Sequence, residues 1–248
     1  MTEISANSNM DLQFSISETG QATAKAFADY LIEKHKNTDQ LHIALSGGST
    51  PKILFDLLAK EYDGQVDWSK IHLYWGDERC VPPTDEESNY KMTVDHLLSK
   101  VDIPESNVNR VFGENDPVME AERYGQLIED QIEHLNDQPV FDIIILGMGT
   151  DGHTASIFPH EMELLDSPKT CEVANHPESG QKRVTLTGPV INAAKSVCFL
   201  VTGDSKKEKL KQIVDSAEIA KSYPAFHINP SHGELIWFID ESAASLLK

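Results

Sequence analysis

The sequence lacks long apolar segments and is poor in basic residues. None of its hydrophobic runs reaches the roughly 18 residues that a helix needs to cross a bilayer. It carries 21 Lys and Arg against 40 Asp and Glu, which gives a formal net charge of −19. Proteins that bind phosphate backbones or anionic lipid surfaces need a basic face. We therefore expect neither nucleic acid nor a membrane as a partner.

Cysteine is equally scarce. Cys80, Cys171 and Cys198 are odd in number and far apart, so they form neither a disulfide framework nor a CxxC metal site. We expect them to be reduced, partly buried side chains. The first residues, MTEISANSNMDLQF, lack the basic and apolar regions of a secretory signal, so we expect a cytoplasmic protein.

Motifs for metals and nucleotides are also missing. No HExxH, HxxxH or EF-hand pattern occurs, and the P-loop pattern GxxxxGK[ST] is absent. The stretch GMGTDG at 147–152 has the glycine spacing of a dinucleotide fingerprint, but it leads into His153 rather than into a helix. We expect no metal and no cofactor.

What remains is typical of one α/β domain. Hydrophobic content is 40% and charged content 25%, as in ordinary globular proteins. Apolar runs alternate with amphipathic stretches, which predicts a doubly wound, mostly parallel sheet with helices on both faces, a modified Rossmann-like fold. No linker divides the chain, so we expect a single domain over 1–248, with 1–17 a poorly ordered or edge segment. Predicted strands cover 41–45, 71–75, 141–146, 183–187, 196–201 and 234–239, and predicted helices cover 20–36, a segment from Thr50 onward, and about 88–99, 117–135 and 204–216.

Unusual residues follow several of these strands, where ligands bind in such folds. The first group is a glycine turn that opens a helix, a structure whose N–H groups and helix dipole suit an anion. A tight turn capped by Thr50 explains the same pattern without a ligand. The candidate phosphate-binding residues are Ser46, Gly47, Gly48, Ser49 and Thr50.

The second group, Asp77 and Arg79, follows the strand at 71–75. A fixed guanidinium suits an anionic substrate, although most such clusters are only surface charge. Two further cations, Arg183 and Lys206, lie near predicted strand ends and would create a local positive field in an acidic protein.

The third group follows the most apolar strand, at 141–146. Its glycine-rich loop holds Asp151 and His153 two positions apart. Histidine exchanges a proton near neutral pH, and a neighbouring carboxylate can fix its tautomer. We predict His153 to be a general base, with Asp151 beside it. Ser156 has no evident activating partner in the sequence, so an acyl-enzyme is the lesser hypothesis.

Taken in order, six blocks resemble the 6-phosphogluconolactonase family, which also contains glucosamine-6-phosphate deaminases. The blocks are LSGGSTP, YWGDERCVP, SNY, LGMGTDGHTASIFP, KRVTLTGPVINAA and VTGDSKK, and the resemblance covers about 18–240. It implies a carboxylic ester hydrolase that converts 6-phospho-D-glucono-1,5-lactone to 6-phosphogluconate in the oxidative pentose phosphate pathway, without a cofactor. The implied partner is the sugar-phosphate lactone, and the implied state is a monomer or small homo-oligomer.

The resemblance also implies roles for single residues. His153 matches the family's general base, with Asp151 in the same loop, and Arg79 and Arg183 match cations that grip the substrate. The glycine turn and Lys206 would lie close to the phosphate. Asp77 falls where the related deaminases have a proton-transfer aspartate, and its role in a lactonase stays open.

Two rival functions remain. Deaminases of the family carry a glutamate five residues after the histidine, where this chain has Phe158, and a tyrosine where it has Arg79. A non-catalytic sugar-phosphate sensor would need a DNA-binding segment, and about 17 residues precede the first predicted helix. The two residue differences therefore disfavour a deaminase, and the short first segment disfavours a sensor.

Overall fold

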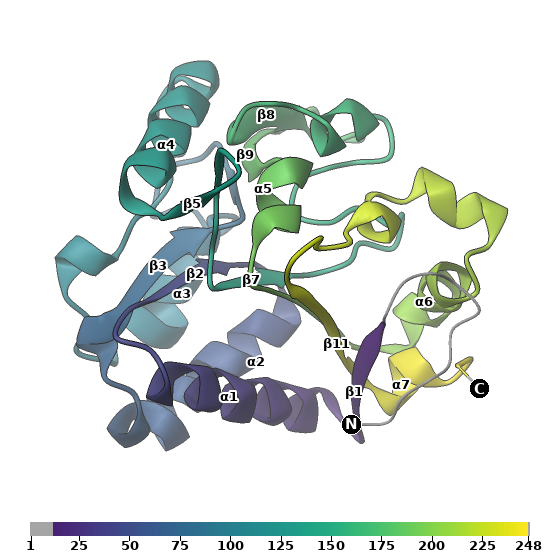
Figure 1. The fold of residues 1–248 in the computed structure, drawn as a ribbon, viewed down its shortest axis with the longest axis horizontal. Coiled ribbons are helices and arrows are strands. Elements are labelled where there is room, and N and C mark those ends of the chain that lie inside the picture. The colour runs from purple at the N-terminus through teal and green to yellow at the C-terminus, as the bar shows by residue number, and fades with distance from the viewer. Residues whose placement is uncertain (1–11, 248) are drawn as a thin grey trace.

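The computed structural model describes residues 12–247 and has a six-stranded parallel sheet at its centre (Figure 1). The strand order is β1-β11-β10-β7-β2-β3, and every neighbouring pair is parallel. This confirms the predicted α/β class. The strands are β1 (Gln13–Ser17), β2 (Leu41–Leu45), β3 (Ile71–Trp75), β7 (Ile143–Leu146), β10 (Ser196–Val201) and β11 (Glu234–Asp240).

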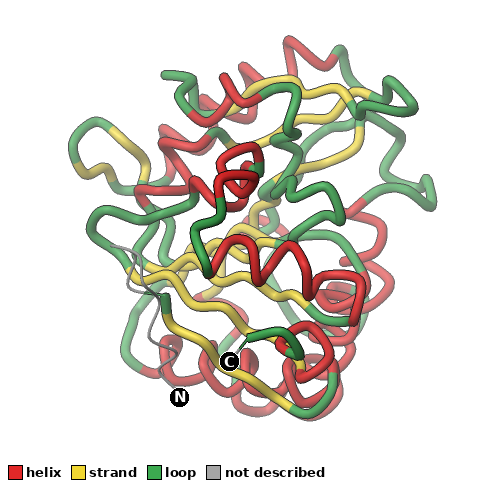
Figure 2. Tube along the Cα trace, turned by 90° about the vertical axis from the view of Figure 1, so that its right-hand side faces the viewer, coloured by secondary structure: helices red, strands yellow, loops and turns green. Residues whose placement is uncertain are grey.

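Helices lie on both faces of this sheet (Figure 2). No helix within residues 12–247 is long and apolar enough to cross a membrane. The α-helices are α1 (Gly20–Lys36), α2 (Ser49–Leu57), α3 (Asn89–Thr93), α4 (Pro117–Gln131), α5 (Gly188–Ala193), α6 (Lys207–Val214) and α7 (Glu241–Ala244). Two of them continue as π-helical turns, α2 through Leu58–Tyr62 and α3 through Val94–Leu98.

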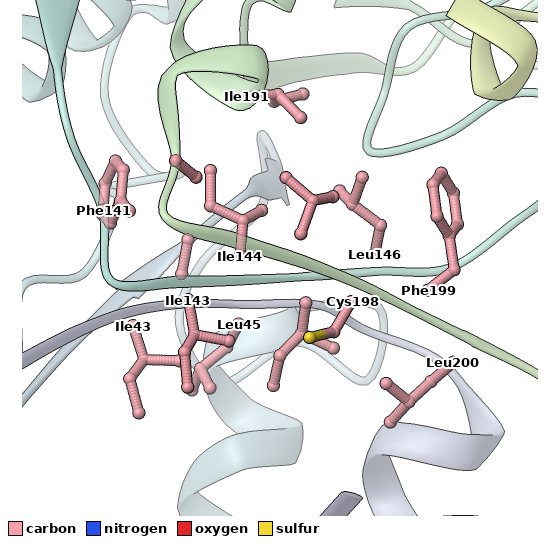
Figure 3. Close-up of a cluster of buried hydrophobic side chains, with 14 of the residues drawn as sticks. Ile43, Leu45, Phe141, Ile143, Ile144, Leu146, Ile191, Cys198, Phe199 and Leu200 are labelled. Carbon is pink, nitrogen blue, oxygen red and sulfur yellow. The ribbon is translucent and has the colours of Figure 1, made fainter. Parts of the chain in front are cut away.

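The core is built by strands whose two faces are both covered. Along a strand successive side chains point to opposite faces. Ile143 and Leu200 accordingly point to one face, and Ile144 and Phe199 to the other, beside Ile191 of α5 (Figure 3). All five are at most 3% exposed. This explains why β7 and β10 read as continuous apolar runs rather than as alternating ones.

The strand predicted at 183–187 does not lie in the central parallel sheet. It is β9 (Lys182–Leu186), which pairs antiparallel with β4 (Asp77–Arg79) and β8 (Cys171–Asn175) in a separate three-stranded sheet. This strand therefore lies outside the parallel sheet, and the rest of the predicted strands belong to that sheet. Only Gly76 separates β3 from β4, so the chain leaves the parallel sheet at this residue and enters the second sheet.

Two helix boundaries also differ from the prediction. Helix α4 ends at Gln131, because β5 (His134–Leu135) and β6 (Gln138–Pro139) form a small hairpin. Its turn residues Asn136 and Asp137 have φ of 52° and 62°, as a two-residue hairpin turn requires. Helix α6 is preceded by a 3-10 turn at Asp204–Lys206 instead of starting at 204.

At the amino-terminal end, β1 is an edge strand of the parallel sheet. We expected residues 1–17 to be a poorly ordered or edge segment. Residues 1–11 of this segment lie outside the part of the chain that the structure describes.

The direction in which successive strands are added to the sheet reverses between β2 and β7. From β2 the chain continues to its neighbour β3 on one side, whereas β7 lies on the other side of β2 and leads on to β10 and β11. The loops that follow β2 and β7 therefore diverge, and they leave a crevice at the carboxyl ends of the strands.

Candidate active site

A cleft of about 220 Å³ lies at this point, between the loops that follow β2, β4, β7 and β10. Every candidate site residue except Asp151 lines it. The lining residues are Ser46, Gly47, Gly48, Ser49, Thr50, Pro51, Asp77, Arg79, Asn89, Gly147, Met148, Gly149, His153, Ala155, Arg183, Leu200, Val201, Thr202 and Lys206.

The glycine turn after β2 opens helix α2 toward the cleft. Gly48 is the N-cap residue, with φ of 110°, a conformation that glycine adopts without strain. It has no side chain to cap the helix, so the first N–H groups of α2 are left for another acceptor. The Thr50 hydroxyl is 2.8 Å from that of Thr202, which follows β10, and this contact links the start of α2 to the end of β10.

His153 is held by Asp151. The distance between His153 Nδ1 and Asp151 Oδ1 is 2.6 Å, and the same carboxylate oxygen accepts the backbone N–H of His153 at 3.1 Å. Burial raises the pKa of Asp151, but the hydrogen bonds and charge of His153 outweigh it, and the pKa falls to about 2. The carboxylate therefore accepts from Nδ1–H, which leaves Nε2 as the basic nitrogen of the neutral ring.

The space around this pair requires glycine at two positions. A Cβ on Gly149 would lie 2.2 Å from His153 Nδ1, and a Cβ on Gly152 would lie 2.5 Å from the ring of Tyr223. The backbone of Gly152, with φ of 89°, therefore turns under Tyr223 and presents His153 to the cleft. Asp151 itself does not line the cleft.

Two arginines are brought side by side by the second sheet. Arg79 of β4 is paired in register with Arg183 of β9. Burial and the charge of Arg79 both lower the pKa of Arg183, which is 8% exposed. Within residues 12–247, the Nε atoms of both side chains are buried without a hydrogen-bond partner. Two adjacent cations with unused donors favour an anionic ligand in this cleft.

Lys206 and Asp77 complete the charges of the cleft. Burial lowers the pKa of Lys206, and the charge of Asp151 opposes this effect. The Asp77 carboxylate accepts a hydrogen bond of 2.6 Å from the Ser156 hydroxyl. Ser156 thus has a partner that the sequence did not reveal, but its side chain is fully buried and does not line the cleft. This position does not suit a nucleophile.

Phe158 packs against His153 and Arg183. It is fully buried, with its ring centroid 4.8 Å from that of His153 and 5.5 Å from the guanidinium carbon of Arg183. No proton-exchanging group therefore occupies this position next to the histidine. Among residues 12–247, no three His, Cys, Asp or Glu side chains converge in a way that would hold a metal ion.

Comparison with known proteins identifies the family. The model of the family described as glucosamine-6-phosphate isomerases/6-phosphogluconolactonase matches residues 15–237. The chain belongs to this family.

Its relatives are similar over most of their length. The 6-phosphogluconolactonase of Haemophilus influenzae is 43% identical, over 91% of this chain and 95% of the relative. That of Treponema pallidum is 46% identical, over 77% and 80%. The solved structure of 6-phosphogluconolactonase from Trypanosoma brucei is 28% identical, with a TM-score of 0.82, and covers 97% of this chain and 100% of that one.

Asn89 is among the lining residues that the sequence did not single out as candidates. Asn89 is only 4% exposed, yet its side chain lines the cleft between the glycine turn and Arg79. It belongs to the SNY block that supported the resemblance. A short polar segment outside any strand end carries no local sign of this role, because only the folding of α3 against β4 brings it there.

Proposed function

We propose that this chain hydrolyses 6-phospho-D-glucono-1,5-lactone to 6-phospho-D-gluconate, the lactonase step of the oxidative pentose phosphate pathway. The relatives named 6-phosphogluconolactonase, at 43% and 46% identity, support the activity. The observation that carries the proposal is the His153–Asp151 pair on a cleft that also exposes Arg79, Arg183 and Lys206. A general base can activate the water that attacks an ester, and the neighbouring cations can bind an ester that carries negative charge.

In the proposed mechanism His153 activates water. The water oxygen forms a bond to the lactone carbonyl carbon while Nε2 of His153 takes one of its protons. The bond from this carbon to the ring oxygen then breaks, and the imidazolium returns the proton to the departing oxygen. Asp151 keeps Nδ1 as the donor and stabilises the imidazolium between the two steps.

The phosphate supplies orientation. We place it against the N–H groups of Gly48, Ser49 and Thr50, with Lys206 and Arg183 as counter-charges. The uncapped N-terminus of α2 and the partner-free Nε of Arg183 support this position. Binding at this remote group holds the carbonyl near His153, which converts binding energy into rate. Arg79, in this proposal, grips the sugar end of the substrate.

Phe158 argues against deamination of glucosamine 6-phosphate. An isomerising deaminase needs a group that exchanges a proton with the ring oxygen, and an apolar ring cannot do so. A carboxylate at this position would be buried between His153 and Arg183, where the structure has an aromatic ring.

The test is an assay with freshly generated 6-phosphogluconolactone, in which acid release is followed against spontaneous hydrolysis. Acceleration is expected with the phosphorylated lactone, much less with gluconolactone, and none with His153→Ala. Ammonia release from glucosamine 6-phosphate without any lactonase activity would contradict the proposal. The cytoplasmic location and the monomeric or small oligomeric state stay predictions.

A further inference from the structure

Glu78 is a buried carboxylate outside the roles described so far. It is 2% exposed and accepts four hydrogen bonds of 2.7 to 3.0 Å. Three come from the backbone N–H groups of Arg79, Asn89 and Tyr90, and the fourth comes from the hydroxyl of Ser88. Burial raises the pKa of Glu78, and the three backbone donors oppose this effect. A buried acid with four donors is fully satisfied, so it fixes the segment around it.

This segment also holds the other end of Arg79. The Arg79 guanidinium donates from Nη1 to the backbone carbonyl of Glu87 at 2.6 Å, while its own backbone N–H is held by Glu78. The guanidinium is thus bonded to Glu87 directly, and the backbone N–H is connected to residues 88–90 through the Glu78 carboxylate. The direction of its guanidinium depends on where Glu78 keeps that segment.

Asn89 links the same segment to the opposite wall of the cleft. Its Nδ2 donates to the backbone carbonyl of Asp77 at 2.9 Å. Its Oδ1 lies so close to Gly47 that a Cβ on Gly47 would be 2.0 Å away. Gly47 does not adopt a left-handed backbone, so the reason for glycine at this position is contact with Asn89.

We propose that Glu78 and Asn89 are positioning residues that hold Arg79 and the glycine turn at a fixed separation across the cleft. Glu78 acts through Arg79, and Asn89 acts through Gly47. The inference rests on the proposed function, because the separation matters for a ligand with an anion at one end and a sugar at the other. Even a small displacement of a substrate-binding group is enough to reduce turnover strongly.

The first test uses Glu78→Gln, which keeps the shape but turns an NH₂ group toward the donors. We expect the dissociation constant for 6-phosphogluconate, measured by calorimetry, to rise about tenfold to a hundredfold, since buried hydrogen bonds to a charge are lost. In an Arg79→Ala background the same change should alter affinity less than about twofold. If Glu78 acts through Arg79, the effects of the two substitutions on the binding free energy do not add. Equal effects in both backgrounds would overturn the role of Glu78.

The second test needs no change at Glu78, so it applies even if that variant does not fold. Gly47→Ala should raise KM strongly and lower the unfolding temperature. Asn89→Ala should raise KM less, and the double variant should resemble Asn89→Ala, because the clash is removed. Gly64→Ala, where a Cβ meets nothing within 4 Å, is the matched control. If Gly47→Ala is equally damaging with and without Asn89, the proposed contact is refuted.

The two proposals fail in different ways. If wild-type protein binds 6-phosphogluconate but does not accelerate lactone hydrolysis, the proposed activity is wrong, and the Glu78–Arg79 cycle, which is measured by binding, still reports on positioning. If hydrolysis is fast but the cycles are additive, the activity stands and the positioning role is wrong.

Discussion

Replacing Asp151 by Asn tests the general-base mechanism most directly. The pKa of Asp151 falls from the ordinary 3.8 to about 2, and its interaction with His153 is responsible. At 1.36 kcal/mol per pKa unit this corresponds to about 2.4 kcal/mol. Because the Asp151 side chain is 41% exposed, solvent screening reduces the usable part to about 1 kcal/mol. An imidazolium formed during turnover loses this stabilisation in the variant.

We therefore expect kcat to fall between about 5-fold and 60-fold, with KM within about twofold of wild type. KM should change little because Asp151 does not line the cleft. Initial rates of acid release over a range of lactone concentrations, corrected for spontaneous hydrolysis, give both constants. Asp39→Asn, the same charge change in the exposed loop before β2, is the control, and thermal unfolding checks that both variants fold. An unchanged kcat, or a loss confined to KM, would refute the role of Asp151.

Three further predictions follow from the burial of charged and titratable groups. Arg183→Ala should raise KM for the phosphorylated lactone about tenfold or more and leave gluconolactone hydrolysis unchanged; an equal loss on both substrates would contradict a phosphate role. Phe158→Glu should release no ammonia from glucosamine 6-phosphate and should lower the unfolding temperature, because a carboxylate replaces a fully buried ring. His42 and His72 stack at 4.7 Å, and burial lowers the pKa of both. Below about pH 6.5 the unfolded chain binds protons that the folded chain resists, so the free energy of unfolding should fall as the pH drops. Urea titrations at pH 7.5 and 5.5 measure the difference, and His72→Phe should reduce it; an undiminished difference in this variant would exclude the pair as its source.

Much of the site was predictable because it depends on strand ends. Carboxyl ends of parallel strands meet at one edge of a sheet, so Ser46, His153 and Lys206 could be grouped from their positions after apolar runs. The fold class was predictable for the same reason. Alternating apolar and amphipathic segments leave few arrangements other than a covered parallel sheet.

Other features of the fold and the site could not be predicted, because they depend on pairing between residues that are far apart in the chain. The three residues of β4 are too few to show a period, and their partners in β9 lie about a hundred positions later in the chain. The adjacency of Arg79 and Arg183 follows from this pairing alone. Nothing near Asp77 in the sequence indicates that Ser156 donates to it.

The amino-acid sequence by itself determined the class of fold, the edge of the sheet that carries the site and most of the charged residues there. Periodicity and turn chemistry are local properties, and they act wherever the segment lies. Only the tertiary structure decided which distant residues meet: Arg79 beside Arg183, Ser156 within 2.6 Å of Asp77, and Asn89 against Gly47. These contacts depend on how separately formed elements pack, because side chains far apart in the chain meet only when the core closes between them.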